Sequence, residues 1–359
     1  MVFIANASNM RYNDYIEIEG EEFPMTIKDL SAQTGYSVGT ISRVLNNQPN
    51  VSEKAREVIL KAAEESGFQL NQNAKQLKQQ HSTTILVVVK GVSNEMFSRC
   101  VEVLQTLAAA TRYPLIVDYI DENDNEVQAA LRLCREKKPL GILFLGGNQK
   151  HFLADFDKIN VPCVLVTNSA KGLPFPSLAS VTSDDVLFGR MAIEHMVSLG
   201  HRKFAVIGGD RDESDIVRLR YNGCMEAFLR HGIKFVPELD YETTRFSYAD
   251  GYKATKKLLK RGRDFTALFC MSDVMAIGAI RALRDAGKRV PEDVSVMGLD
   301  GLDIGEYTVP KLATVCQSVD TIAQTSLELL LDQIENKTPA QHKVIPVYLE
   351  WRESARHID

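Results

Sequence analysis

Side chains that can hydrogen-bond DNA bases are concentrated between residues 37 and 46. The segment carries hydroxyls, one amide and one guanidinium, including those of Ser42, Asn46 and Arg43. An arginine can donate two hydrogen bonds to the edge of a guanine in the major groove, which distinguishes that base pair from the others. The residue types therefore predict recognition of double-stranded DNA, provided that a helix presents them on one exposed face.

Two short amphipathic helices joined by a glycine turn would provide that face. Thr26 and Asp29 form a capping box that starts the first helix, and Gly35 supplies the left-handed position that ends it. Ser37 caps the second helix. The pattern predicts a helix-turn-helix, although two capped helices could also form a packed corner without DNA function. The predicted DNA contacts in this unit are Thr26, Ser37, Val38, Gly39, Thr40, Ser42, Arg43 and Asn46.

A third helix should complete a small core. Ser52 caps it, Gly67 ends it, and its apolar residues recur with helical spacing at Ala55, Val58, Ile59 and Ala62. The stretch after it, residues 71–78, is polar apart from an alanine and a leucine. It offers too little apolar surface to be stable as an isolated helix, so we expect a segment that becomes helical only under some conditions.

Charge is distributed unevenly along the 359 residues, whose net charge is −5. Residues 1–24 hold one arginine against five acids, whereas residues 25–80 hold seven Lys and Arg against five acids. Positive charge therefore lies where the base-reading groups lie. An excess of two is modest for neutralising DNA phosphates, so tight binding predicts that two chains act together as a homodimer.

The acidic extension, residues 1–24, is a candidate for removal from the native chain. Glu19-Gly-Glu-Glu22 must be encoded by purine-rich codons that resemble a ribosome-binding site, two codons before Met25. We therefore hypothesise that translation starts at Met25. The alternative is a disordered acidic arm that lowers the affinity for DNA.

Metal, cofactor and catalytic motifs are not evident in the sequence. The six cysteines are widely spaced without a CxxC pair, and the seven histidines show no metal-ligand spacing. No nucleophile or phosphate-loop motif is present. The sequence therefore predicts reduced cysteines, no metal, no cofactor and no enzymatic activity. It has no apolar run of membrane-spanning length and no secretion signal, so we expect no membrane association and a cytoplasmic protein at the nucleoid.

From residue 83 onward, apolar runs alternate with helical stretches. Seven such runs lie at 85–89, 114–120, 140–145, 161–167, 203–209, 265–270 and 293–300. Helices are expected around 184–199, 215–231, 249–261 and 273–287. Buried strands alternating with helices are typical of parallel sheets, so the fold class is α/β, with two sheets and a cleft between them.

The chain resembles the lactose/galactose repressor family of bacterial transcription regulators. The motifs DLSAQTGYSVGTISRVLN, VSEKAREVILKAAEESGF and NQNAKQL carry the resemblance first, followed by SDDVLFG, RLRYNG and VPEDVSVMGLDG. It covers almost all of residues 25–354. The resemblance implies a three-helix DNA-binding domain, a hinge helix and an effector domain similar to periplasmic sugar-binding proteins. In the hinge, the positions that match DNA contacts are Asn71, Ala74 and Leu77, and Leu77 matches a leucine that wedges between base steps in the minor groove.

The resemblance also implies a domain organisation. The DNA-binding domain would cover residues 25–70, the hinge 71–82, and the effector-binding and dimerisation domain 83–359. The chain is expected to cross three times between the lobes of that last domain. Lobe 1 would comprise residues 83–182 and 313–338, and lobe 2 residues 183–312 and 339–359. The short tail after Trp351 has no leucine heptads, which favours a dimer over a tetramer.

The effector site is expected at the strand ends between the lobes, where α/β proteins bind ligands. Sugar hydroxyls suit planar charged partners, and the apolar face of a pyranose suits an aromatic ring. By the resemblance, Asp273 matches a sugar-binding aspartate that could instead be a plain helix cap. Arg218 matches the effector-gripping arginine, with Arg220 suited to a structural role, and Phe246 matches the stacking ring. The remaining candidates are Asn94, Phe97, Thr167, Asn168, Asp300 and Gln317.

These observations predict a DNA-binding repressor of carbohydrate-utilisation genes under allosteric control. Its partners would be palindromic operator DNA, a second copy of the chain and a small effector between the lobes. An uncharged sugar is favoured because basic residues are not clustered near the proposed contacts, while a sugar phosphate or a nucleoside stays open. The alternative is a sugar- or nucleoside-binding regulator that acts with a protein corepressor.

Overall fold

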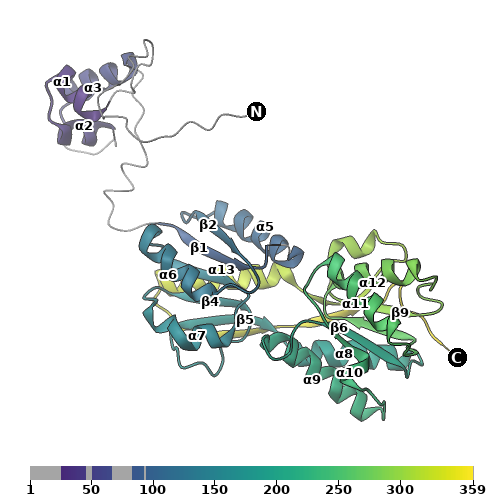
Figure 1. The fold of residues 1–359 in the computed structure, drawn as a ribbon. Coiled ribbons are helices and arrows are strands. Elements are labelled where there is room, and N and C mark those ends of the chain that lie inside the picture. Colours follow the sequence, from purple (N-terminus) through teal and green to yellow (C-terminus); the bar gives the residue numbers. More distant parts are fainter. Residues whose placement is uncertain (1–25, 46–50, 67–82, 93, 359) are drawn as a thin grey trace, which may run out of the picture. The chain divides into compact units, whose positions relative to one another are not determined.

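The structure, a computed structural model, describes residues 26–45, 51–66, 83–92 and 94–358. The chain divides into two compact units, residues 1–80 and 81–359 (Figure 1). The acidic extension and four predicted DNA contacts, at Asn46, Asn71, Ala74 and Leu77, lie outside the described residues. The two units are described separately below.

The described residues of the first unit form the three helices that the sequence predicted there. They are α1 (Ile27–Thr34), α2 (Val38–Leu45) and α3 (Glu53–Glu65). Thr26 and Asp29 form the expected capping box, and Gly35 ends α1 with φ at +71°. The buried apolar core consists of Leu30, Ile41, Val44, Ala55, Ile59, Ala62 and Ala63. Val58 was expected on the inward face of α3, but it is 41% exposed, and Ala63 occupies the buried position instead.

The second unit contains two six-stranded sheets, which confirms the predicted α/β class. The lobe 1 sheet consists, in spatial order, of β11 (His342–Ile345), β5 (Leu178–Ser183), β4 (Cys163–Thr167), β3 (Gly141–Leu145), β1 (Ile85–Lys90) and β2 (Leu115–Ile120). The lobe 2 sheet consists of β12 (Val347–Glu350), β10 (Ala313–Gln317), β9 (Ser295–Asp300), β8 (Ala267–Cys270), β6 (Phe204–Gly208) and β7 (Tyr241–Thr243). Neighbouring strands are parallel except β10 and β12.

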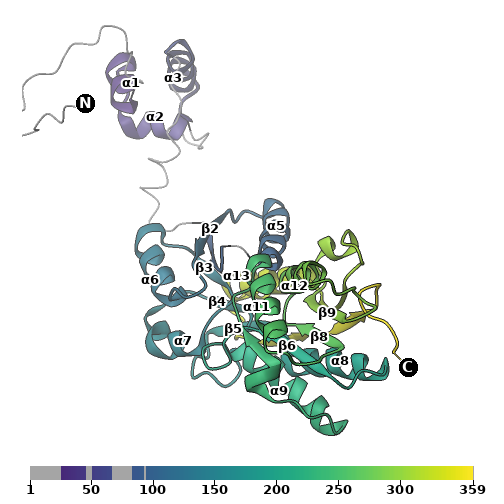
Figure 2. The same cartoon turned by 45° about the vertical axis from the view of Figure 1, so that its right-hand side comes forward.

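Helices cover both faces of each sheet, which buries the strands on both sides (Figures 1 and 2). In lobe 1 these are α5 (Glu95–Ala109), α6 (Glu126–Lys137), α7 (Gln149–Asp155), the 3₁₀ helix η1 (Phe156–Lys158) and α13 (Val319–Glu335). In lobe 2 they are α8 (Asp185–Ser198), α9 (Asp215–Arg230), α10 (Pro237–Asp240), α11 (Tyr248–Lys260), α12 (Asp273–Asp285) and the 3₁₀ helix η2 (Asp303–Glu306). The four helices expected in lobe 2 are confirmed.

Two of the expected lobe boundaries are wrong. Residues 313–317 were assigned to lobe 1, but β10 pairs with β9 in the lobe 2 sheet. Residues 342–345 were assigned to lobe 2, but β11 pairs with β5 in the lobe 1 sheet. Both strands lie next to crossovers between the lobes, so the strand with which each one pairs decides which sheet it joins. Within the described residues, no helix is long and apolar enough to cross a membrane.

Candidate functional site

The helix α2 presents the predicted base-reading side chains on its solvent side. Ser37, Gly39 and Arg43 are exposed, whereas Val38, Thr40 and Ser42 are partly exposed. Ile41 and Val44 face the core on the opposite side. The helix start is fixed because the backbone N–H of Thr40 donates to Ser37 Oγ at 3.2 Å. The surface is therefore rigid and polar, as docking in a major groove requires.

The first helix start is equally well fixed. The backbone N–H of Thr26 donates to Asp29 Oδ2 at 2.9 Å, and the Thr26 hydroxyl donates to the same oxygen at 2.6 Å. These two hydrogen bonds lower the pKa of Asp29, with the side-chain bond as the larger cause. Thr26 is exposed beside this cap, where a helix N-terminus can meet a phosphate.

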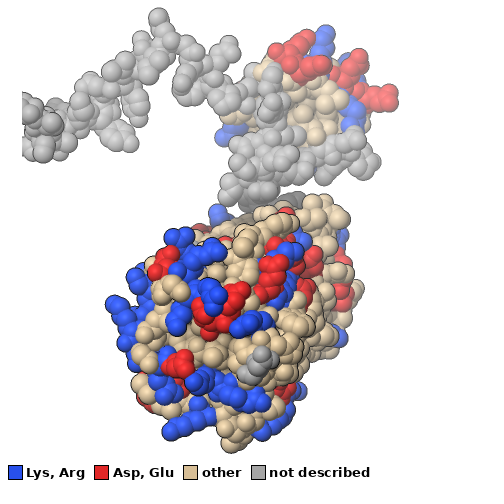
Figure 3. All heavy atoms as spheres, turned by 90° about the vertical axis from the view of Figure 1, so that its right-hand side faces the viewer, with Lys and Arg blue, Asp and Glu red and all other residues tan. Residues whose placement is uncertain are grey.

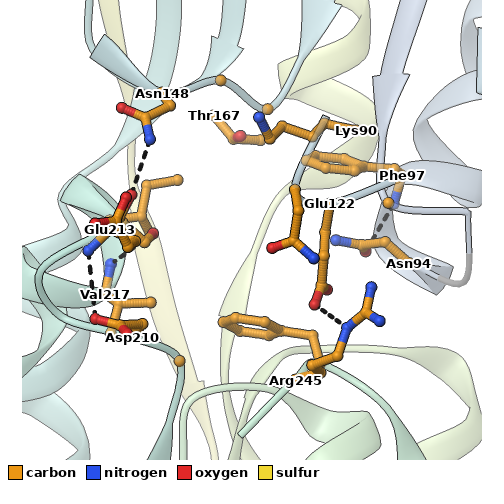
Figure 4. Close-up of a pocket in the computed structure, with 18 of the residues that line it drawn as sticks. Lys90, Asn94, Phe97, Glu122, Asn148, Thr167, Asp210, Glu213, Val217 and Arg245 are labelled. Carbon is orange, nitrogen blue, oxygen red and sulfur yellow. Dashed lines mark hydrogen bonds and ion pairs between the residues drawn. The ribbon is translucent and has the colours of Figure 1, made fainter. Parts of the chain in front are cut away.

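The second unit contains a cavity of about 980 Å³ that is lined by residues of both lobes (Figure 4). Its wall includes residues at the carboxyl ends of parallel strands, where α/β folds bind ligands. The last residues of three strands line it, Lys90 of β1, Thr167 of β4 and Asp300 of β9, as do Gly146 and Gly209, which directly follow β3 and β6. Six of the nine predicted effector residues line it, namely Asn94, Phe97, Thr167, Asn168, Phe246 and Asp300.

On the lobe 1 side of the cavity, hydrogen bonds to the backbone fix the polar side chains. Asn94 is the N-cap of α5, and its Oδ1 accepts from the N–H of Phe97 at 3.2 Å. Asn168 donates from Nδ2 to the carbonyl of Gly147 at 2.9 Å. Thr167 has φ at +75°, an uncommon conformation for a residue with a Cβ. The polar groups of this wall are therefore preorganised.

Arg220, not Arg218, occupies the lobe 2 wall. Its Nε donates to Asp185 Oδ1 at 2.9 Å and its Nη1 donates to the carbonyl of Met271 at 3.1 Å. Both side chains of the ion pair are less than 10% exposed. Burial raises the pKa of Asp185 to about 6, although the charge of Arg220 opposes that shift.

Arg218 was the predicted effector contact, and the structure corrects that placement. Its side chain is 49% exposed, pairs with Asp215 and lies outside the cavity lining. Residues two positions apart on a helix point to opposite sides, so only one of Arg218 and Arg220 can face the cavity.

Asp300 is the buried acid of the cavity. Its φ is +127°, a strained value for a non-glycine residue, and such strain clusters at functional sites. Gln317 lies outside the cavity lining and donates from Nε2 to Asp300 Oδ1 at 2.8 Å. Burial raises the pKa of Asp300 to about 8, while the charge of Arg220 lowers it. Burial therefore favours the protonated carboxyl, which can donate a hydrogen bond.

Asp273, the second predicted acid, is placed outside the cavity lining. Its carboxylate accepts from Thr314 Oγ1 at 2.7 Å and from the N–H of Leu302 at 2.7 Å, and it is fully buried. Burial raises its pKa to about 6. It is not the helix cap either, because Ser272 caps α12. Asp273 therefore ties α12 to β10 and to the segment after β9.

Several cavity residues were not predicted. They include Lys90, Glu122, Asn148, His151, Glu213 and Arg245. Two pairs of them bridge the lobes: Arg245 binds Asp121 at 3.1 Å as well as Glu122, and Asn148 Nδ2 donates to the carbonyl of Glu213 at 3.0 Å. Figure 4 shows these two bridges on opposite sides of the cavity. Their only signal in the sequence is that each lies in a loop or at a helix start near a strand end.

The cations of the cavity are all paired with carboxylates. Lys90 Nζ lies 2.5 Å from Glu126 Oε2, Arg220 binds Asp185, and Arg245 binds Asp121 and Glu122. The lining also carries three further carboxylates, those of Asp210, Glu213 and Asp250, and the buried carboxyl group of Asp300. The cavity therefore offers many hydrogen-bonding groups without an excess of positive charge.

Charges on the surface of the second unit are mixed rather than segregated. On the face in Figure 3, basic and acidic side chains are interspersed over the described residues. Ion pairs four residues apart within the second unit include Arg281 with Asp285 and Arg289 with Asp293. No group of acidic, histidine or cysteine side chains in the described part of the chain could hold a metal ion.

Known proteins match this chain along almost its whole length. Residues 26–71 match the model for bacterial regulatory proteins of the lacI family, and residues 166–355 match a periplasmic binding protein-like domain. The HTH-type transcriptional regulator MalR of Clostridium butyricum is 33% identical, over 93% of this chain and 100% of its own. A Lac repressor dimer bound to operator and the anti-inducer ONPF superposes with a TM-score of 0.77 at 26% identity, covering 93% of this chain and 100% of that one. The transcriptional regulator CelR in complex with cellobiose gives 0.68 at 26% identity, covering 92% and 100%.

Proposed function

The chain belongs to the lacI family of bacterial regulatory proteins, and from this premise we propose that an uncharged carbohydrate bound between its lobes controls its binding to operator DNA. The family consists of DNA-binding transcriptional regulators, so the chain is a regulator and not an enzyme. The expected fold, the helix-turn-helix and the family assignment are thereby confirmed. A regulator acts where its operator is, so we expect it in the cytoplasm.

The DNA contacts follow from the exposed face of α2. Arg43 and Ser42 lie on the side opposite the buried Ile41 and Val44, where they can reach base edges. We propose that Arg43 reads a guanine, and that Thr26 and Ser37 position the two helix starts on phosphates. The contacts of Asn71, Ala74 and Leu77 belong to the same proposal, with Leu77 as a minor-groove wedge.

The charge balance of the cavity supports an uncharged effector. Lys90, Arg220 and Arg245 are each held by a protein carboxylate, so a phosphate would meet no free cation among them and several carboxylates nearby. Phe97 and Phe246 line the same cavity and offer faces for a sugar ring. Polar groups fixed by backbone contacts suit sugar hydroxyls. The similar CelR structure contains cellobiose, which agrees with this choice.

Control of DNA binding would work by linkage. The two lobes meet around the effector, and a homodimer like that of the similar Lac repressor would join two DNA-binding domains. If the effector changes operator affinity, operator DNA must change effector affinity by the same factor, typically about 5–150-fold. The sign of the effect, induction or corepression, is an outcome of the experiment below.

The test is a selection of palindromic DNA with a central C-G step, followed by fluorescence anisotropy with the selected sequence. We expect the wild-type protein, but not Arg43→Ala, to bind one palindrome selectively. Maltose, cellobiose, glucose, glucose 6-phosphate and cytidine are then added in separate titrations. A change with a neutral sugar supports the proposal, and a stronger change with the phosphate or the nucleoside refutes it. Selective binding that needs a second protein would identify a corepressor instead.

A further inference from the structure

A fully buried carboxylate lies directly behind the lobe 1 wall of the cavity. Glu126, in the first turn of α6, has a side chain that is 0% exposed. Its Oε2 accepts from Lys90 Nζ at 2.5 Å and contacts His151 Nδ1 at 2.9 Å, and its Oε1 accepts from the backbone N–H of Asn148 at 2.6 Å. A buried charge is tolerated only when it is paired and hydrogen-bonded, and these three partners meet that need.

The three partners of Glu126 face the cavity, although Glu126 does not. Lys90, Asn148 and His151 all line it. Gly147, next to Asn148, makes this arrangement possible, because a Cβ there would lie 2.8 Å from the Phe152 ring and 3.4 Å from Glu126 Oε1. Glu126 is therefore a positioning residue, because it orients the polar surface formed by Lys90, Asn148 and His151 toward a ligand in the cavity.

His151 lies between Glu126 and the cavity. Glu126 Oε2 lies 2.9 Å from Nδ1 of His151 and accepts a hydrogen bond when Nδ1 carries the proton. In that tautomer of the imidazole, Nε2 is an unprotonated acceptor. The side chain of His151 is 26% exposed and lines the cavity. We therefore expect Nε2 to accept a hydrogen bond from a ligand hydroxyl.

This polar surface extends across the cavity wall: Lys90 lies beside Phe97, whereas Asn148 lies on the opposite side. Figure 4 shows Asn148 and Glu213 across the cavity from Phe97, Asn94 and Arg245. Lobe 2 closes over the Asn148 side, because Lys150 Nζ lies 3.3 Å from Glu213 Oε2. The cavity volume of about 980 Å³ is near the upper end of the range of ligand pockets, about 300–1,000 Å³. This volume leaves room for a ligand longer than one sugar ring that extends from the Phe97 side to Asn148.

We propose that Lys90, Asn148 and His151, oriented by Glu126, form a second polar subsite that binds the second unit of an oligosaccharide effector. The effector class is thereby narrowed from carbohydrates in general to disaccharides or longer chains. This inference rests on the proposed function, because it assumes that the cavity binds a sugar.

The test is isothermal titration calorimetry of the full chain with glucose, maltose and cellobiose. We expect the wild type to bind at least one disaccharide about tenfold or more tighter than glucose. His151→Ala and Glu126→Gln should weaken that disaccharide by about tenfold or more and change glucose binding by less than about twofold, since the lost contact is specific to the second ring. Matched controls are Gln149→Ala on α7 and the exposed Glu136→Gln on α6, both outside the cavity lining, and both should bind like the wild type.

A spectroscopic measurement separates positioning from simple loss of structure. Nitrogen-15 chemical shifts of selectively labelled histidine should show His151 protonated on Nδ1 in the wild type, and the disaccharide should shift the Nε2 signal. In Glu126→Gln the preference for Nδ1 should be lost, while thermal unfolding reports whether the variant is folded. His151→Ala replaces a partly exposed side chain and keeps the inference testable if Glu126→Gln fails to fold.

The outcomes distinguish this inference from the proposed function. If a disaccharide binds the wild type and His151→Ala equally well, the subsite is wrong while the sugar effector stands. If glucose binds as tightly as the disaccharides, the subsite is likewise wrong. If none of the three sugars binds the wild type, the sugar-effector proposal fails, and the subsite fails with it.

Discussion

Replacing Arg220 with methionine should be far more damaging than the same change at Arg218. Arg220 and Asp185 form an ion pair in which both side chains are less than 10% exposed. Methionine keeps the aliphatic volume but leaves Asp185 buried without its partner. Removing one member of a buried pair costs about 3–5 kcal/mol, because the remaining charge is uncompensated. That is a large fraction of the stability of a typical domain, about 5–15 kcal/mol.

Arg218→Met is the matched control on the same helix. Arg218 is half exposed and binds only Asp215 among the ion pairs of the described residues, so its loss should change stability by about 0.5 kcal/mol or less. Urea unfolding of the full chain, followed by circular dichroism, measures the two changes. Adding Asp185→Asn to Arg220→Met should recover part of the lost stability, because the stranded charge is then removed.

The response to the effector should also be affected more by Arg220→Met than by Arg218→Met. Arg220 lines the cavity and Arg218 does not, so Arg220→Met should abolish the response of DNA binding to the effector, while Arg218→Met preserves it. To separate binding from instability, the response is measured at a temperature where Arg220→Met remains folded. A response lost in Arg218→Met and retained in Arg220→Met would refute this prediction.

Three further predictions concern other residues. Burial raises the pKa of Asp300 from 3.8 to about 8, so between these pH values the folded state holds a proton that the unfolded chain has lost. The free energy of unfolding should therefore fall as the pH rises from 4 to 8. Urea unfolding of Asp300→Asn should show a smaller fall over the same range. An Asn variant with the same pH slope as the wild type would contradict this. Arg43→Ala should cost about 1–3 kcal/mol of operator affinity and relax the preference at one base position, measured by anisotropy with single-base operator variants. Ile41→Ala should cost about 2–5 kcal/mol because Ile41 is fully buried, with partly exposed Val38→Ala as a milder control in thermal unfolding.

Local signals explain why the DNA-binding unit was predicted closely. A capping box, a left-handed glycine and a second cap define α1 and α2 within a few residues of each other, and each signal acts through nearby backbone groups. The strands β5, β7, β10, β11 and β12 were not predicted. Strand β7 has three residues, and β11 is exposed at three of its four positions, so neither produces an apolar run. Strand β11 joins a sheet only by pairing with β5, which lies far away in the sequence.

The choice between Arg218 and Arg220 was, in contrast, available from periodicity. The buried residues of α9 include Val217, Cys224 and Ala227, and Arg220 falls in the same stripe while Arg218 does not. An apolar stripe with helical spacing identifies the inward face of a helix from its sequence alone. The match by sequence position outweighed this signal and led to Arg218, which lies outside the cavity lining. The set of contacts around Glu126 had no comparable signal, because β1, α6 and α7 meet there only after the sheet has formed.

The bridges between the lobes indicate what an effector must supply. Arg245 and Asp121 are each about half exposed, and Lys150 and Glu213 are more exposed still. Exposed ion pairs of this kind contribute little, because water and salt screen them. They can orient the lobes but cannot hold the cavity closed against a competing open state. A ligand shifts such an equilibrium only by its difference in affinity between the two states, and each tenfold difference corresponds to about 1.4 kcal/mol. The contacts that can provide this difference are those with buried support on both lobes, Arg220 and Asp300 on one and His151 on the other. An effector that reaches only one of these lobes would bind without closing the cavity, and it would leave DNA binding unchanged.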